Sequence, residues 1–288
     1  MNPQPDTLTA ANLLGDARIL WQLLRGQPAR HRDGAPSNAA AHAATLQNFY
    51  APQAERYDAF REKLLHGRRE LIERLAISPG STVIDMGGGT GRNLDYFGAR
   101  MLSLARVEVV DLCPALLQQA RRRCAQWPDV AVAVEADATT YRPQAGANRG
   151  LSHAHSHVDC VIFSYSLTMI PDWRRAINNA LRILRPGGLI GVVDFRVSRR
   201  DPPPGYSRHG ALTRRFWPRW FGHDGVHLDA EHLHTLAART EPMVCEERMA
   251  AVPYLPGLRA PYYLYIGRKA GRDAGRHAAP HSAQESAV

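Results

Sequence analysis

A glycine-rich turn between an apolar strand and a helix constrains this chain more than any other feature. The segment from Val83 to Met86 is typical of a buried strand that ends in an acidic residue, Asp85, and glycines follow at positions 87, 88, 89 and 91. Glycine accepts the positive φ of a tight turn and has no Cβ that would hold a ligand away from the backbone. The helix beyond the turn offers free backbone N–H groups. The segment therefore predicts a ligand-binding loop at the end of a strand.

Strand-like and helix-like segments alternate along the chain around this loop. The expected strands are Ser81–Met86, Val107–Val110, Val130–Val134, Asp159–Tyr165 and Leu189–Phe195. The expected helices between them are Gly91–Leu104, Ala115–Trp127 and Trp173–Leu184. Arg185–Gly188 (RPGG) is expected to form the turn before the last strand, because glycine ends a helix readily. Such alternation predicts an α/β fold with a doubly wound, mostly parallel sheet.

Acidic residues follow the second and third expected strands. Asp111 comes about 20 residues after the last glycine of the loop, where an acidic residue can accept hydrogen bonds from both ribose hydroxyls of a nucleoside. Asp111 also stands where it can cap the helix that begins at Pro114. Asp137 follows the third strand and, taken alone, is more often a turn residue than a ligand. The glycines at 87, 89 and 91 give the spacing G-x-G-x-G, tighter than the dinucleotide-binding G-x-G-x-x-G, and no P-loop lysine follows them.

Together these features resemble the first motifs of the class I S-adenosylmethionine-dependent methyltransferases. The resemblance implies a Rossmann-like methyltransferase fold, preceded here by an N-terminal helical extension, and S-adenosyl-L-methionine as cofactor. It places the adenine contact of the family after the third strand, at Asp137. The expected cofactor-binding residues are Tyr57, Asp85, Gly87, Gly89, Gly91, Asp111, Leu112, Asp137, Ala138 and Ser164.

Further segments resemble one group within that superfamily, the bacterial diacylglycerylhomoserine N-methyltransferases of betaine-lipid synthesis. They are Phe49–Arg61, Leu64–Arg68, Phe163–Trp173, Arg215–Phe221, Val252–Pro256 and Pro261–Lys269. The similarity extends from about Leu13 to Lys269, apart from a His-rich insertion around 145–157. It implies three successive methylations of a lipid-linked homoserine amine. It also implies a partner enzyme, a 3-amino-3-carboxypropyl transferase, that makes diacylglycerylhomoserine.

A site for such an amine must accept a growing quaternary ammonium, which aromatic ring faces attract. Tyr57 and Tyr165 are the preferred candidates, whereas Trp217, Tyr262 and Tyr263 are more often core residues. His66 is a candidate proton acceptor, although taken alone it fits a capped or surface histidine better. Arg61 is a candidate partner of the homoserine carboxylate. No metal is expected; His153, His155 and His157 alternate, but in a Gly/Ala/Ser-rich loop.

Two other methyltransferase functions stay open, and two further classes of protein are disfavoured. Quinone C-methyltransferases share the core, phosphatidylethanolamine N-methyltransferases share the chemistry, and the net charge of +9 raises the question of nucleic acid. Only Lys63 and Lys269 are lysines, so arginine carries nearly all the positive charge. We expect no nucleic-acid partner, because the sequence contains no catalytic Asn-Pro-Pro-Tyr motif and no recognisable RNA-binding module. A cofactor-binding protein without activity is disfavoured by the complete glycine loop.

Three regions are expected. Residues 1–42 form an amphipathic helix, Thr7–Arg25, and a linker; residues 43–269 form the methyltransferase domain with its leading helices; residues 270–288 form a disordered tail. No apolar run reaches the length of a spanning helix, and no signal peptide is recognised. We therefore expect a cytoplasmic protein that lies peripherally on the inner face of the membrane, through Thr7–Arg25 and Arg214–Phe221. Acyl-chain preference, processivity and oligomeric state cannot be predicted from the sequence.

Overall fold

The computed structural model describes residues 44, 46–47, 64–143, 158–222, 225–253 and 257–271. Its helices are α4 (Arg68–Arg74), α5 (Asn93–Phe97), η2 (Gly98–Ser103), α6 (Pro114–Cys124), η3 (Leu167–Met169), α7 (Trp173–Ile183), α8 (Ala211–Gly222) and α9 (Glu231–Arg239). Its strands are β1 (Thr82–Met86), β2 (Arg106–Asp111), β3 (Ala131–Glu135), β4 (Val158–Ser164), β5 (Leu184–Phe195), β6 (Glu241–Ala251) and β7 (Arg259–Arg268). Among the described residues, no helix is long and apolar enough to cross a membrane.

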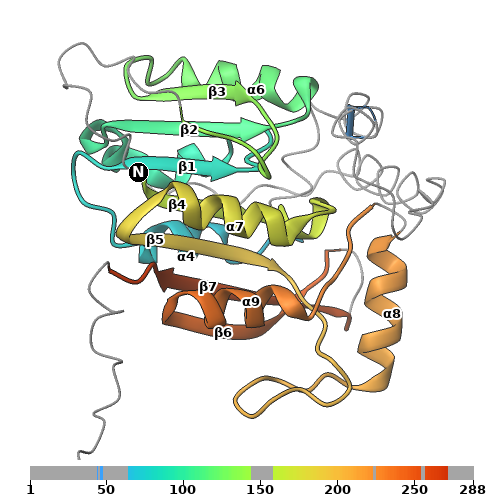
Figure 1. The fold of residues 1–288 in the computed structure, drawn as a ribbon. Helices are drawn as coiled ribbons and strands as arrows, with labels where there is room; N and C mark the ends of the chain where they lie inside the picture. Colours follow the sequence, from blue (N-terminus) through green and yellow to red (C-terminus); the bar gives the residue numbers. More distant parts are fainter. Residues whose placement is uncertain are drawn as a thin grey trace, which may run out of the picture.

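The seven strands form one sheet in the order β3-β2-β1-β4-β5-β7-β6 (Figure 1). The first five strands are mutually parallel, and β7 runs antiparallel to both β5 and β6. The chain starts in the middle of the sheet at β1, moves outward to β3 and then returns to β4 beside β1. Parallel strands whose order reverses in this way leave a crevice at their carboxyl ends, where ligands bind. The expected doubly wound, mostly parallel α/β fold is confirmed.

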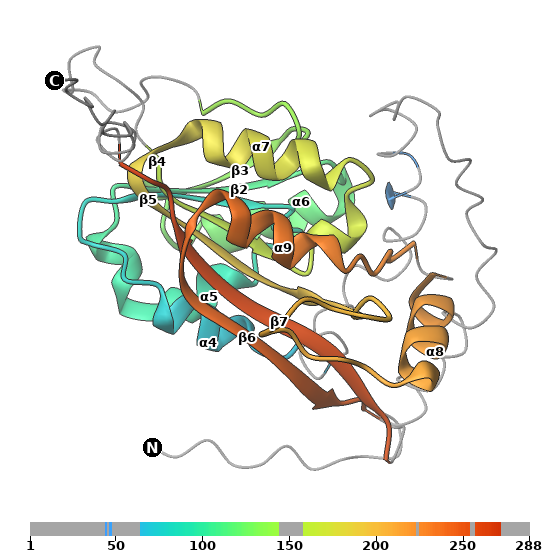
Figure 2. The ribbon, with the colours of Figure 1, turned by 60° about the horizontal axis from the view of Figure 1, so that its bottom comes forward.

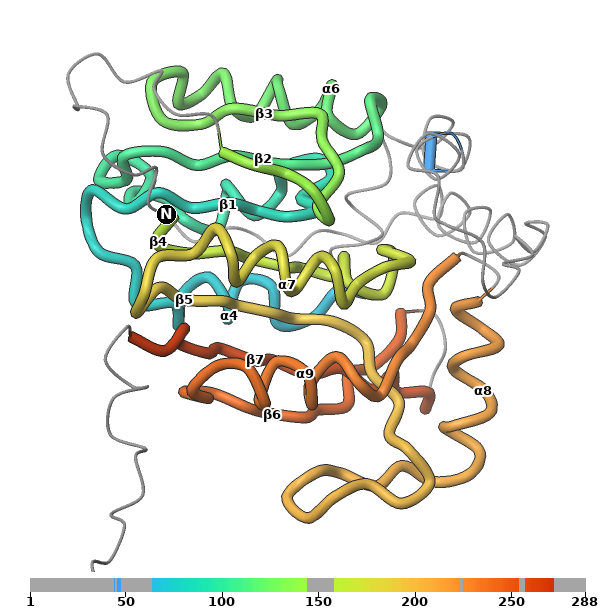
Figure 3. Tube along the Cα trace, viewed as in Figure 1, coloured from blue at the N-terminus to red at the C-terminus, as the bar shows by residue number. Residues whose placement is uncertain are grey.

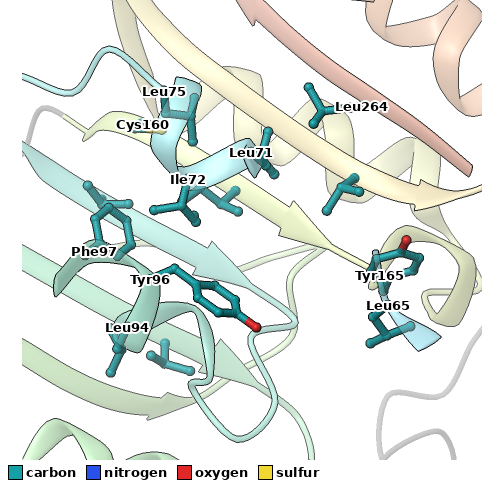
Figure 4. Packing of buried hydrophobic residues seen from close by; sticks show 14 of the residues in the cluster. Leu65, Leu71, Ile72, Leu75, Leu94, Tyr96, Phe97, Cys160, Tyr165 and Leu264 are labelled. Atoms are coloured by element: carbon teal, nitrogen blue, oxygen red, sulfur yellow. The ribbon is translucent and has the colours of Figure 1, made fainter. Parts of the chain in front are cut away.

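Helices cover both faces of the sheet, as Figures 1 and 2 show. On one face, α4, α5, α6 and α8 contribute to the larger apolar cluster; on the other, α7 and α9 pack against the smaller one. Figure 4 shows Leu71 and Ile72 of α4, and Leu75 directly after the helix, within the larger cluster. The helix approaches β5 so closely that a Cβ at Gly191 would lie 3.0 Å from Leu75 Cδ1. Small residues in the central strands therefore fix the position of α4.

Two boundaries differ from the sequence-based expectation. The single helix expected from Gly91 to Leu104 is divided into α5 and η2, because Gly98 adopts a positive φ of 53° and interrupts the helical path. The turn expected at Arg185–Gly188 is included in β5, which begins at Leu184. Its pairing with β4 shifts register between Val158 and Cys160, so the glycine pair forms an irregularity within the strand.

The chain leaves the sheet after β5 and forms α8 beyond the carboxyl ends of the parallel strands (Figure 3). It then returns through α9 to the antiparallel pair β6 and β7. Trp217 and Phe221 attach α8 to the larger apolar cluster. Helix α8 thus lies at the edge of the sheet where the crevice opens, and β6 forms the far lateral edge.

Candidate active site

A pocket that is open to solvent lies at the carboxyl ends of β1, β2 and β4. Ligands of doubly wound sheets bind at this edge, outside the carboxyl ends of the parallel strands. The pocket is lined by the glycine loop, the end of β2, the turn after β3 and the segment after β4. The lining residues are Leu46, Gly87, Gly89, Val110, Asp111, Leu112, Leu116, Ala136, Asp137, Ala138, Thr139, Tyr165, Ser166, Met169, Ile170, Pro171 and Asp172. The fold therefore brings together residues that are separated by more than a hundred positions.

The glycine loop is held against β2 by its own backbone. The N–H groups of Gly87 and Gly88 both donate to the carbonyl of Val110, at 2.7 and 3.1 Å. Gly87 has a φ of 67°, and a Cβ at this position would lie only 2.5 Å from Ser166 Cβ. Gly87 is therefore required both by its conformation and by the close approach of the segment after β4.

Asp111 connects the loop to the start of α6. Its Oδ2 accepts a hydrogen bond from the N–H of Gly89 at 2.9 Å, and its Oδ1 accepts one from the N–H of Cys113 at 2.8 Å. Each carboxylate oxygen has a further lone pair, and the side chain lines the pocket beside Leu112. The carboxylate is thus oriented before any ligand binds. Its position suits a ligand with two neighbouring hydroxyl groups.

The turn after β3 forms the part of the pocket wall next to Asp111. Asp137 Oδ1 accepts a hydrogen bond from the N–H of Thr139 at 2.7 Å, so the aspartate also holds its own turn. Asp137 and Ala138 both line the pocket. Beside them, the apolar side chains of Leu46, Val110 and Leu116 offer a surface for a flat ring.

Three of the expected cofactor-binding residues lie outside the pocket lining. Gly91 contacts α6 instead: its φ is 73°, and a Cβ there would lie 3.4 Å from Ala120 Cβ. Asp85 is 1% exposed beneath the loop and accepts hydrogen bonds from Asn93 Nδ2 at 3.0 Å on both oxygens. Ser164 accepts from Arg68 Nε at 3.2 Å. These residues support the loop and the strand ends from behind.

The support under the loop is a buried polar network that sequence reasoning missed. Arg68 Nη2 donates to Asn93 Oδ1 at 3.0 Å, and Asn93 in turn donates to Asp85. Burial raises the pKa of Asp85 to about 6, while the hydrogen bond from Asn93 and the charge of Arg68 oppose the rise. The only signal in the sequence was the alternation of side chains along β1, which puts Asp85 on the same face as Val83 and toward α5.

Tyr165 lies at the end of β4, where the pocket meets the aromatic core. Its φ of 55° is the only positive value at a non-glycine position among the described residues. Its hydroxyl donates to the backbone oxygen of His66 at 2.7 Å, and its ring packs edge-on against Phe195 with centroids 4.7 Å apart. Figure 4 shows Tyr165 beside Leu65, apart from the side chains of α4. An unusual backbone conformation at a pocket residue is typical of a functional position.

The imidazole of His66 lies outside the pocket lining. Its Nε2 lies 3.1 Å from the oxygen of Ala251, which can only accept, so Nε2 carries the proton in this contact. His66 contacts Tyr165 through its backbone oxygen. Tyr57 and Arg61 lie outside the described residues. Tyr262 and Tyr263 are buried in β7, as the core interpretation predicts.

Asp194 fixes the rim of the pocket, and sequence reasoning also missed this residue. It accepts hydrogen bonds from Thr168 Oγ1 at 2.7 Å and from the Thr168 N–H at 3.1 Å. Its side chain is fully buried, and burial raises its pKa to about 6 against the hydrogen bonds from Thr168. Because Thr168 belongs to η3, Asp194 holds Met169 and Ile170 at the pocket.

The residues of the pocket fit the cofactor expected from the sequence. The carboxylate of Asp111 suits the ribose hydroxyls, the apolar surface near Asp137 suits the adenine ring, and the backbone at Gly87 and Gly89 is accessible because no Cβ covers it. Gly87, Gly89, Asp111 and Asp137 are therefore the residues that would hold the cofactor.

Comparison with known proteins agrees with this geometry. The family described as a methyltransferase domain matches residues 57–240. The demethylmenaquinone methyltransferase of Tropheryma whipplei is 26% identical over 170 residues, which span 57% of this chain and 65% of that protein. This chain therefore covers less than two thirds of that relative.

Solved structures share the fold. A phosphoethanolamine N-methyltransferase of Haemonchus contortus superposes with a TM-score of 0.56 at 15% identity, covering 78% of this chain and 60% of the other. A geranyl diphosphate methyltransferase in complex with S-adenosylmethionine superposes with a TM-score of 0.51 at 18% identity, covering 83% and 92% of the two chains. At these identities the likeness concerns the fold.

Proposed function

The chain belongs to the class I S-adenosylmethionine-dependent methyltransferases, and on that premise we propose that it methylates the amine of a lipid-linked homoserine. The product of three successive transfers to diacylglycerylhomoserine is the betaine lipid diacylglyceryl-N,N,N-trimethylhomoserine. One observation carries the proposal. Phe163–Trp173, a segment that resembles the N-methyltransferases of this lipid, also contributes Tyr165, Ser166 and the four residues from Met169 to Asp172 to the pocket.

The cofactor supplies a methyl group on a positively charged sulfur, which an amine nitrogen can attack in line. The nitrogen lone pair forms the new C–N bond as the C–S bond breaks and the sulfide leaves. After each of the first two transfers the ammonium loses a proton to solvent, whereas the third transfer leaves no proton on the nitrogen. The leaving sulfide needs no activation, so the protein's main contribution is to position the amine and exclude water. Tyr165 is the aromatic residue of the pocket lining that could attract a cation, and Phe195 packs edge-on against it from the core.

An aromatic ring face at the methylation site becomes more important with each transfer, because the positive charge on the nitrogen becomes permanent. The first two transfers yield amines that can lose a proton, whereas the last yields a quaternary ammonium with permanent charge. A ring face attracts such a cation without offering it a proton acceptor. We assign this role to Tyr165, with Tyr57 as a second aromatic contact and Arg61 as the partner of the homoserine carboxylate. A 3-amino-3-carboxypropyl transferase would supply the substrate, and the reaction would take place at the inner surface of the membrane.

The test is an assay of labelled lipids in cells. The chain is produced together with an enzyme that forms diacylglycerylhomoserine, the cells are fed methyl-labelled methionine, and their lipids are separated by thin-layer chromatography. We expect label in the trimethylated betaine lipid and none with Asp111→Ala, which removes the oriented carboxylate. If wild-type protein binds the cofactor but the betaine lipid stays unlabelled, the lipid-homoserine assignment is wrong.

A second candidate is C-methylation of a quinone precursor. It is favoured by the 26% identity with a demethylmenaquinone methyltransferase over 170 residues, or 57% of this chain. The same labelled extract distinguishes the two candidates, because a methylated quinone separates from a betaine lipid on the plate. Label in phosphatidylcholine would instead identify phosphatidylethanolamine as the acceptor.

A further inference from the structure

Helix α8 exposes apolar and cationic side chains along a single stripe. Leu212, Arg215, Phe216 and Arg219 are all exposed, and their spacing of three, one and three residues puts them on one side of the helix. Leu212 is 85% exposed and Phe216 is 38% exposed. Two large apolar side chains on a solvent-facing stripe do not stabilise the isolated fold, so they indicate a surface that something covers.

The charged side chains of α8 itself all have one sign. Between Pro202 and His223 the sequence contains arginines at 208, 214, 215 and 219 and neither aspartate nor glutamate. Arg214 and Arg219 donate to backbone oxygens, of His209 at 2.7 Å and of Arg215 at 3.0 Å. Within the described part of the chain, no carboxylate forms an ion pair with an arginine of α8. The covering surface should therefore carry negative charge.

The inner side of α8 connects this stripe to the pocket. Trp217 and Phe221 are buried, and the ring of Phe221 lies 4.3 Å from that of Phe195. Phe195 contacts Tyr165, which lines the cofactor pocket. Aromatic packing is thus continuous from the exposed stripe to the place where the methyl group is expected. Figure 1 shows α8 on the side toward which β1, β2 and β4 point.

We propose that α8 is the element by which this protein lies on an anionic lipid bilayer. Leu212 and Phe216 enter the boundary between headgroups and acyl chains, while Arg215 and Arg219 contact lipid phosphates. Trp220, half-buried with its ring 5.5 Å from that of Phe216, is suited to the same boundary. The contact would bring the mouth of the pocket to the lipid surface. That such a contact serves catalysis rests on the proposed lipid substrate.

Two other coverings fit the stripe less well. A second copy of the chain would bring arginine stripes together, and like charges repel. A nucleic acid would satisfy the arginines but would leave Leu212, the most exposed large apolar side chain of the molecule's described part, in water. A bilayer with anionic headgroups satisfies both kinds of side chain at once.

The experiment is sedimentation of the full-length protein with vesicles of phosphatidylcholine, with or without 30% phosphatidylglycerol. We expect binding to anionic vesicles only, reduced at least tenfold by Leu212→Ser/Phe216→Ser and by Arg215→Gln/Arg219→Gln. Leu102→Ser/Met243→Ser is the matched apolar control, because these side chains are 80% and 45% exposed elsewhere. Arg121→Gln/Arg122→Gln, on the exposed side of α6, is the matched charge control. Both control variants should bind as the wild type does.

Calorimetry with S-adenosylhomocysteine shows that each variant is folded, since α8 contributes no residue to the cofactor pocket. Equal vesicle binding by all four variants and the wild type would overturn the proposal. So would a loss of binding in the arginine variant alone together with tight binding of duplex RNA, which indicates nucleic acid. Dimerisation that disappears in the Leu212/Phe216 variant, without vesicle binding, would identify a second copy as the covering.

The vesicle-binding experiment can succeed or fail independently of the test of the proposed function. Vesicle binding is measured without a methyl acceptor, so it holds whether or not diacylglycerylhomoserine is the substrate. If the lipid is methylated, the Leu212/Phe216 variant should be slow on vesicle-embedded substrate and normal on substrate dispersed in detergent. Equal slowing in both would place these residues in substrate binding and overturn their role at the bilayer.

Discussion

Gly87 is the residue at which the cofactor loop tolerates least change. It combines a φ of 67° with 2.5 Å between a built Cβ and Ser166. We expect Gly87→Ala to weaken S-adenosylhomocysteine binding at least tenfold in calorimetry. The loop must move to relieve the contact with Ser166, and this movement disturbs its hydrogen bond to the Val110 oxygen. Gly80→Ala is the matched control, since Gly80 has a φ of 76° but nothing within 4 Å. It should cost about 1 kcal/mol in stability and leave binding unchanged; equal binding by both variants would contradict the geometry.

Tyr165 allows the ring to be tested separately from the hydroxyl. Tyr165→Phe removes the hydroxyl, with its hydrogen bond to the His66 oxygen, and keeps the ring, whereas Tyr165→Leu also removes the cation-attracting ring face. We expect the first variant to keep activity within a few-fold, and the second to lose roughly tenfold or more on the last methylation. Separate quantities of mono-, di- and trimethylated product measure this. Uniform loss over all three steps would argue against a role in holding the quaternary product.

Asp85 makes stability depend on pH. Its folded-state pKa of about 6 lies above the usual value of 3.8, because burial disfavours the charge. Because the folded state holds this proton more tightly than the unfolded state, the protonated Asp85 contributes to the free energy of unfolding. This contribution is complete below about pH 4 and is lost as the pH rises through 6. The unfolding free energy of Asp85→Asn, measured in urea relative to wild type, should therefore rise by on the order of 2 to 3 kcal/mol between pH 4 and 7. Asp194, which shifts the same way, is present in both proteins and cancels; a constant difference would refute the assignment.

Helix α4 carries two arrangements of charge with opposite surroundings. Arg68 is 9% exposed and bonds to Asn93 and Ser164, whereas Glu70 lies at the surface and pairs with Arg248 of β6 at 2.5 Å. Removal of a buried partner leaves a buried charge uncompensated, and exposed pairs contribute little. We expect Arg68→Met to cost about 3 kcal/mol and Arg248→Met less than about 1 kcal/mol. Only the second cost should shrink in 1 M salt; chemical denaturation at two salt concentrations measures both.

The elements around the glycine loop could be predicted because local signals agree with the fold there. β1 to β4 lie within two residues of their expected positions, since buried parallel strands are short apolar runs between polar turns. β6 and β7 were not predicted as strands. β6 is a half-exposed edge strand rich in charge, and β7 is a continuous apolar run that periodicity cannot assign to either class. Helix α8 was not predicted either, because it contains Pro218 and proline is unfavourable inside a helix.

The residues of the pocket were predictable to the extent that strand ends meet at one edge. Gly87, Gly89, Asp111, Leu112, Asp137, Ala138 and Tyr165 line the pocket as that rule implies. Asp85 was placed in contact with the cofactor because it ends the same strand, but its side chain points toward α5. Arg68 and Asn93 could not be found, because their partners are fixed by the packing of α4 on the sheet. Long-range contacts of this kind leave no local pattern.

Cofactor binding should raise the stability of the whole described fold against unfolding. A ligand that binds only the folded state stabilises it by about 2.7 kcal/mol at a hundred times its Kd, or roughly 5 to 10 °C in Tm for a chain of this size. We expect S-adenosylhomocysteine to produce this shift in wild type and, at the same ligand concentration, about half of it or less in Gly87→Ala, whose binding is weakened at least tenfold. Hydrogen exchange should slow at the glycine loop, at Asp111–Cys113 and at Asp137–Thr139. The amides of β6, on the far edge of the sheet, should gain only the protection that follows from global stability. A larger gain in β6 than at the loop would show that the ligand binds elsewhere.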